Sequence, residues 1–141
     1  MVSRGFGLAL AWAVIVTGCA LLGCGAGEAC EHRGGQRSDF IYKLPIKTDD
    51  GTLCFANKNT LELGFWGGSD MRLKQELALR EAFVAAGYTE GPTEKKEESI
   101  TVTFYGKDQI VNVFLMPTRS TRPSPFKKAT MMQFNVLQFK K

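Results

Sequence analysis

A strict alternation of apolar and polar residues in the second half of the chain constrains the fold more than any other feature. Residues 100–105 read Ile-Thr-Val-Thr-Phe-Tyr, so every second side chain as far as Phe104 is apolar. Because successive side chains of a strand point to opposite faces of a sheet, this pattern predicts a strand with one buried face. The more continuous apolar run Ile110–Met116 predicts a central strand, and residues 130–139 alternate again and predict a last one.

Three shorter segments show the same pattern earlier in the chain. Residues 39–47 place Phe, Tyr, Leu and Ile on one face, and Pro45 within this segment indicates an edge position. Residues 52–56 and 61–65 also alternate, and residues typical of turns separate the three segments. We therefore expect a three-stranded meander here.

One helix is predicted between the two sets of strands. The sequence Gly-Gly-Ser-Asp at 67–70 interrupts the strand pattern and supplies a helix start, and Gly87 suits the position just after a helix end. One stripe of the intervening helix, residues 71–86, carries large apolar side chains that we expect to pack in the core: Leu73, Leu77, Val84 and Tyr88.

The predicted order of elements is βββ-α-βββ, because the polar segment 89–99 is expected to be a solvated loop. Short connections between strands favour antiparallel pairing. The fold class that follows is α+β, with a single antiparallel sheet of about five to six strands and one packed helix.

A short apolar run at the N-terminus ends in two closely spaced cysteines. Arg4 precedes the run 6–16, which is long enough for the core of a signal peptide but short for a membrane span. The run closes on Val-Thr-Gly-Cys19, and five residues later the chain reads Leu-Leu-Gly-Cys24. Both endings resemble the lipobox of bacterial lipoproteins, in which the cysteine receives the lipid. A plain signal peptide or a single membrane helix over 6–22 is the alternative interpretation.

The resemblance implies a lipoprotein signal peptide over residues 1–23 and lipidation of Cys24, with Cys19 as the alternative. Cys24 is favoured because Leu is the preferred residue three positions before the lipidated cysteine and because the chain becomes polar directly after it. Cleavage before Cys24 also leaves an even pair, Cys30 and Cys54, and an even pair in an oxidising compartment predicts a disulfide.

The organisation expected after the signal peptide is a short tether followed by one domain. Residues 24–38 are polar and rich in glycine, which is typical of a flexible tether, and residues 39–141 form the globular α+β domain. Gly25 stands where an aspartate retains such lipoproteins in the inner membrane, so the resemblance implies the outer membrane, with the domain facing the periplasm.

The charges are distributed unevenly. Residues 109–141 contain six basic residues and no acidic one, whereas all 14 acidic residues lie before Gln109. Such an asymmetry can mark a surface for an anionic partner, although a solvated loop is the simpler interpretation. The candidate contact surface comprises four basic residues of the 117–128 loop and one tryptophan beside flexible glycines: Arg119, Arg122, Lys127, Lys128 and Trp66.

No motif in the chain indicates catalysis, a metal site, a cofactor or nucleic-acid binding. The only histidine, His32, lies in the expected tether, where a general base would not be held in place. We therefore expect a non-enzymatic binding or adaptor module that contacts the membrane through its lipid and an envelope protein or anionic envelope component through its domain. An inhibitor or exclusion lipoprotein is the first alternative. A small envelope hydrolase is the second, and a deep pocket lined by Glu62, Asp70 or Glu81 would favour it.

Overall fold

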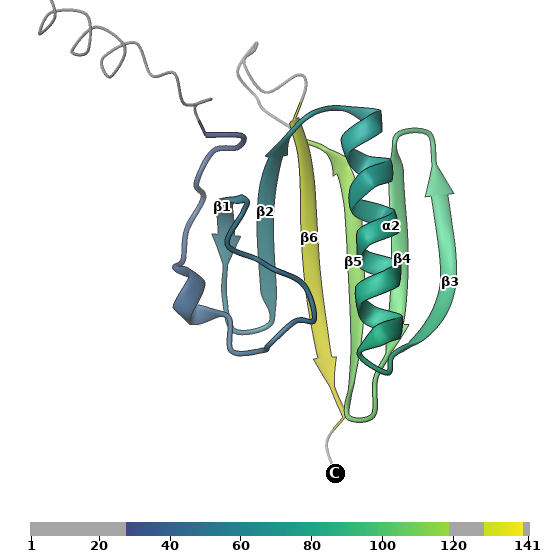
Figure 1. Cartoon of the computed structure of the whole chain (residues 1–141). Coiled ribbons are helices and arrows are strands. Elements are labelled where there is room, and N and C mark those ends of the chain that lie inside the picture. The colour runs from purple at the N-terminus through teal and green to yellow at the C-terminus, as the bar shows by residue number, and fades with distance from the viewer. Residues whose placement is uncertain (1–27, 119–128, 140–141) are drawn as a thin grey trace, which may run out of the picture.

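The protein is a six-stranded antiparallel sheet with one α-helix packed across it (Figure 1). This computed structural model describes residues 28–118 and 129–139. The strands lie in the spatial order β1-β2-β6-β5-β4-β3. In chain order the elements are the 3₁₀ turn η1 (Arg37–Asp39), β1 (Thr52–Ala56), β2 (Thr60–Trp66), α2 (Ser69–Ala85), β3 (Thr89–Lys96), β4 (Ser99–Tyr105), β5 (Gln109–Pro117) and β6 (Ala129–Gln138). The predicted α+β class with a single sheet and one packed helix is confirmed.

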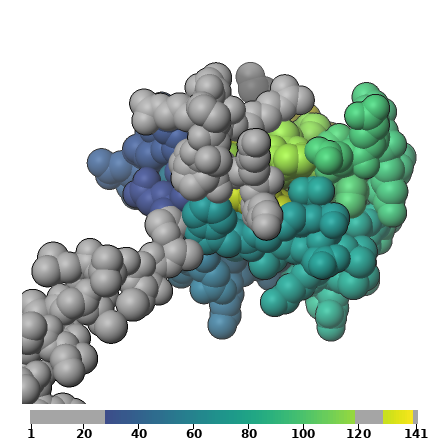
Figure 2. Space-filling view, turned by 90° about the horizontal axis from the view of Figure 1, so that it is seen from above, coloured from purple at the N-terminus to yellow at the C-terminus, as the bar shows by residue number. Residues whose placement is uncertain are grey.

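The C-terminal strand β6 joins the two halves of the sheet, because it pairs with β2 on one side and with β5 on the other. Trp66 at the end of β2 pairs with Ala129, and Pro117 at the end of β5 pairs with Thr130. The hairpin between β3 and β4 lies at the same end of the sheet, since Ile100 pairs with Leu115. We call this the Trp66 end, and Figure 2 views the molecule from this end. The β1–β2 and β4–β5 turns lie at the opposite end.

The two faces of the sheet differ in what covers them. Apolar side chains of alternate positions on β2, β4, β5 and β6 are buried beneath α2 and the segment 40–46, which is packed against the same core. We call this the helix face, and the other is the open face. The buried residues of the helix face are Leu61, Leu63, Val102, Phe104, Val111, Val113, Leu115, Met132, Phe134 and Val136.

The helix packs on the sheet through Leu79 and Phe83, both of which are almost completely buried. The Phe83 ring stacks on Phe104 of β4 with 4.2 Å between the ring centroids, and it meets Tyr88 edge to face at 5.0 Å. The helix ends as predicted, since Gly87 follows its last turn with a φ of 90°.

The prediction of which helix stripe enters the core was wrong. Leu73, Leu77 and Val84 are 54%, 60% and 53% exposed, and of the four predicted residues only Tyr88, beyond the end of the helix, packs against the core. The helix is turned so that its aromatic residue meets the aromatic residue of β4, and this rotation carries the leucine stripe into solvent. The same rotation buries Glu76, whose charge is balanced by an ion pair of 2.8 Å with Arg80.

The predicted strand over residues 39–47 is absent, and this segment has no strand pairing. Its alternation nevertheless reports burial correctly: Phe40, Tyr42, Leu44 and Ile46 pack against the core as an irregular layer beside α2. Pro45 cannot donate a backbone hydrogen bond. Side-chain packing holds this segment on the helix face, together with a hydrogen bond of 3.5 Å from Ile41 N to the Lys58 carbonyl. The first half of the sheet therefore has two strands rather than three.

The prediction of a loop over residues 89–99 was also wrong, because residues 89–96 form the edge strand β3. This strand lacks apolar alternation since its contacts with the helix are polar. Arg80 of α2 forms ion pairs with Glu76 and with Glu90, and its Nη2 donates a hydrogen bond of 2.9 Å to Thr93. The observed order is therefore ββ-α-ββββ.

Candidate binding surface

The open face presents a band of amide and hydroxyl side chains across three neighbouring strands. The Thr103 hydroxyl donates to Asn112 Oδ1 at 2.9 Å, and on the next strand Gln133 Nε2 donates to Asn135 Oδ1 at 3.4 Å. All members are half-buried, so each keeps part of its polar surface in solvent. We call this set the polar band: Thr101, Thr103, Asn112, Gln133 and Asn135.

Apolar side chains border the polar band on the same face. Phe114 pairs with Gln133, and Met116 pairs with Met131 one step closer to the Trp66 end. Trp66 lies at that end of β2 and points to the same face, because its neighbour Phe65 packs with the core of the helix face. Aromatic and methionine side chains beside hydrogen-bonding groups are the composition typical of the centre of a protein interface.

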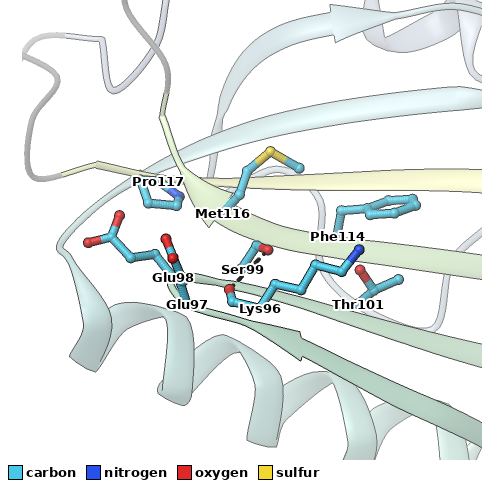
Figure 3. Close-up of a pocket in the computed structure, with 8 residues that line it drawn as sticks. All are labelled: Lys96, Glu97, Glu98, Ser99, Thr101, Phe114, Met116 and Pro117. Carbon is cyan, nitrogen blue, oxygen red and sulfur yellow. Dashed lines mark hydrogen bonds between the residues drawn. The ribbon is translucent and has the colours of Figure 1, made fainter.

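A hollow of about 780 Å³ opens beside this border (Figure 3). One wall is the β3–β4 hairpin, where Ser99 Oγ donates to the Lys96 carbonyl at 3.2 Å. The other wall is the end of β5, which contributes Phe114, Met116 and Pro117. Figure 3 shows these strands side by side with their labelled side chains around the opening. The hollow is open to solvent and is lined by both polar and apolar side chains.

The segment 28–35 covers the open face at β1 and β2. The predicted disulfide is present: Cys30 is bonded to Cys54, with 5.7 Å between their Cα atoms. Ala29 N donates to Thr52 Oγ1 at 3.2 Å, and Arg33 N donates to the Cys54 carbonyl at 2.7 Å. Within the segment 24–38, expected to be a flexible tether, Ala29 and Cys30 are almost completely buried.

The fit of this segment depends on a glycine in β2. A side-chain Cβ at Gly64 would lie 2.9 Å from the Cys30 sulfur and 3.2 Å from the Ala29 backbone. One residue pair further along the same face, the carboxylate of Glu62 is buried and forms an ion pair with Arg33. The Arg33 guanidinium also lies 5.9 Å from the centroid of the Phe55 ring. The segment thus covers the open face at β1 and β2 with a cross-link and polar contacts.

The candidate residues chosen from sequence are partly accounted for. Trp66 is half-buried at the border of the open face, and His32 is exposed with one ring nitrogen 2.8 Å from the Gly35 carbonyl. The remaining candidates lie outside the described residues: Cys19, Cys24, Arg119, Arg122, Lys127 and Lys128. The polar band was not singled out, although its residues are the polar positions of the alternating segments that predicted the strands.

The three carboxylates named for a hydrolase do not converge. Glu62 lies on the open face beneath Arg33, whereas Asp70 and Glu81 are exposed at opposite ends of α2. None of them lines the hollow beside β5, the 480 Å³ groove between α2 and residues 45–50, or the 640 Å³ hollow near Phe139.

Comparison with known proteins gives no relative: no family model, curated protein or solved structure matches this chain. Within residues 28–118 and 129–139, no three metal-ligating side chains of His, Cys, Asp or Glu come together. The helices of this described part include none that is long and apolar enough to cross a membrane.

Proposed function

We propose that this protein is a lipid-anchored, non-enzymatic binding module of the bacterial envelope, held at the outer membrane and facing the periplasm. The observation that carries the binding role is the open face: three adjacent strands present the polar band and its apolar border to solvent. Its partner is an envelope protein or anionic envelope component.

The disulfide supports the location of the domain outside the cytoplasm. Disulfides persist in exported proteins and are rare in the reducing cytosol. The bond uses Cys30 and Cys54, so the cysteines left for a lipid are the two that end the lipobox-like sequences, Cys24 and its alternative Cys19.

The basic residues of the 117–128 segment support an anionic component of the partner. This segment lies between β5 and β6, and Thr118 N near its start donates a hydrogen bond of 2.9 Å to the carbonyl of Ala129, directly after its end. The ends of β5 and β6 that this connection joins, Pro117 and Ala129, lie at the Trp66 end, and the basic residues Arg119, Arg122, Lys127 and Lys128 fall between them in the sequence.

Site-specific photo-crosslinking in the native envelope tests the binding role. A photoreactive phenylalanine analogue replaces Gln133 in the polar band, or Glu81 on the exposed side of α2 as the matched control. We expect a discrete crosslinked species from position 133 that is absent from position 81. Equal crosslinking from both positions, or none from position 133, would contradict the proposal.

Metabolic labelling with a fatty-acid analogue tests the anchor. We expect Cys24→Ser to abolish labelling and release the protein from membranes, whereas Cys19→Ser leaves labelling intact. Labelling that is lost only in Cys19→Ser would assign the lipid to the alternative cysteine. Absence of labelling from both variants and from the wild-type protein would contradict a lipoprotein.

A further inference from the structure

The structure fixes the point at which the N-terminal chain joins the domain. Gly34 forms a parallel bridge with Phe55 of β1, and the Ala56 amide donates to the Gly34 carbonyl at 3.1 Å. Followed backwards, the chain runs beside β1 towards its first residue, Thr52, which accepts the hydrogen bond from Ala29. Thr52 pairs with Gly64, two residues before Trp66. Glu28, next to Ala29, therefore lies at the Trp66 end of the sheet.

Few residues separate this point from the proposed lipid at Cys24. Four residue steps separate Cys24 from Glu28, and a fully extended chain of this length spans at most about 14 Å. The sheet is longer than that, since the eight steps from Ala129 to Leu137 along β6 cover about 26 Å. A lipid on Cys24 therefore keeps the Trp66 end close to the bilayer, whereas Leu137 lies near the opposite end.

The open face has suitable side chains at this end. Trp66 lies about 7 Å along β2 from Gly64, where Ala29 and Cys30 cross the strand. Met131 pairs with Gly64, and Met116 pairs with Met131, so three half-buried apolar side chains lie next to the entry point of the anchor. Tryptophan is enriched at the headgroup level of membranes, where its ring is buried in the apolar boundary and its N–H stays hydrated.

We propose that Trp66, Met116 and Met131 form a membrane-contact surface that seats the Trp66 end of the sheet on the lipid headgroups of the bilayer that holds the anchor. This inference rests on the proposed lipid at Cys24. It places the membrane at one end of the open face and leaves the polar band, further along the strands, accessible to a partner.

Tryptophan fluorescence provides a direct test. Trp66 is the only tryptophan that remains after removal of residues 1–23, because the other is Trp12. The lipidated protein, purified from the envelope, is reconstituted into vesicles of phosphatidylethanolamine and phosphatidylglycerol whose acyl chains do or do not carry bromine, a contact quencher. We expect bromine to remove most of the Trp66 emission.

The matched control moves the indole along the same face. In Trp66→Phe combined with Leu137→Trp, the reporter is at a position that is 55% exposed in the present protein and lies near the opposite end of β6. We expect brominated lipid to leave this emission unchanged. Equal quenching of both proteins would show that the domain lies flat on the membrane, and no quenching of Trp66 would show that this end does not touch it; either result overturns the inference.

Failure of the anchor is detected separately. Vesicle flotation and the acyl label report whether the protein is lipidated and membrane-bound. A protein that neither floats nor carries the label contradicts the proposed lipoprotein and the inference with it. A labelled, floating protein with unquenched Trp66 contradicts only the seating of the sheet.

Discussion

The two faces of the sheet are covered by different means. On the helix face, α2 and residues 40–46 form a broad layer that is held by apolar packing, with Phe83 stacked on Phe104. On the open face, the segment 28–35 covers only β1 and β2, and it is held by a disulfide, backbone hydrogen bonds and the Arg33–Glu62 ion pair. A broad cover can rely on buried apolar area, whereas a narrow cover needs specific bonds because it buries little.

The largest expected effect compares two phenylalanines on neighbouring strands that point to opposite faces. Phe104→Ala on the helix face should lower the free energy of unfolding by about 3–5 kcal/mol, because it removes a completely buried ring and leaves a cavity. Phe114→Ala on the open face should cost only about 1 kcal/mol, since this side chain is half-buried. Urea unfolding followed by Trp66 fluorescence measures both. Similar losses for the two variants would mean that the open face is as well packed as the helix face.

The second effect concerns the cross-link that holds the narrow cover. The double substitution Cys30→Ser and Cys54→Ser should lower the free energy of unfolding by about 3 kcal/mol, because it frees a loop of about 25 residues in the unfolded chain. Thiol titration of the unreduced protein provides the control: the wild-type domain should show no free thiol at these two positions. An unchanged unfolding midpoint in the double variant would show that the hydrogen bonds and the ion pair suffice.

A smaller effect tests whether the close contact between the segment 28–35 and β2 requires a glycine, as distinct from the general effect of replacing a glycine by alanine. Gly64→Ala should destabilise the protein by about 2 kcal/mol, because its Cβ would meet the Cys30 sulfur at 2.9 Å. Gly68→Ala is the matched control, since a Cβ there meets nothing within 4 Å. Thermal unfolding of the two variants tests the difference. Equal shifts of the unfolding midpoint in both variants would show that the close approach of Cys30 to Gly64 does not require a glycine at this position.

Most of the strands could be predicted because their alternation reflects burial on one face. The pattern located β1, β2, β4, β5 and β6 to within a residue or two, and cysteine parity gave the disulfide. Periodicity, however, reports burial and not pairing. Residues 39–47 bury alternate side chains without joining the sheet, whereas β3 joins it through backbone pairing with almost no buried side chain.

The helix orientation and the open face were harder to predict for a related reason. The leucine stripe suggested a core face, but the ring of Phe83 and the ion pairs of Arg80 set the rotation of α2, and both depend on partners that are distant in sequence. The polar band is visible in the sequence as the polar positions of the strands. Only the structure shows that these positions on β4, β5 and β6 form one surface that no other described segment covers, because β6 is inserted beside β5 and β2.

The Cys30–Cys54 bond has a mechanical consequence for an anchored protein. A pull between the lipid and a partner on the open face would enter the domain at Cys30 and pass directly to Cys54 in β1, so residues 31–53 would carry no tension. In the reduced protein the same pull would load these residues first and could draw out about 80 Å of chain. With the proposed lipid at Cys24, the intact disulfide would therefore limit how far the domain can move from the membrane.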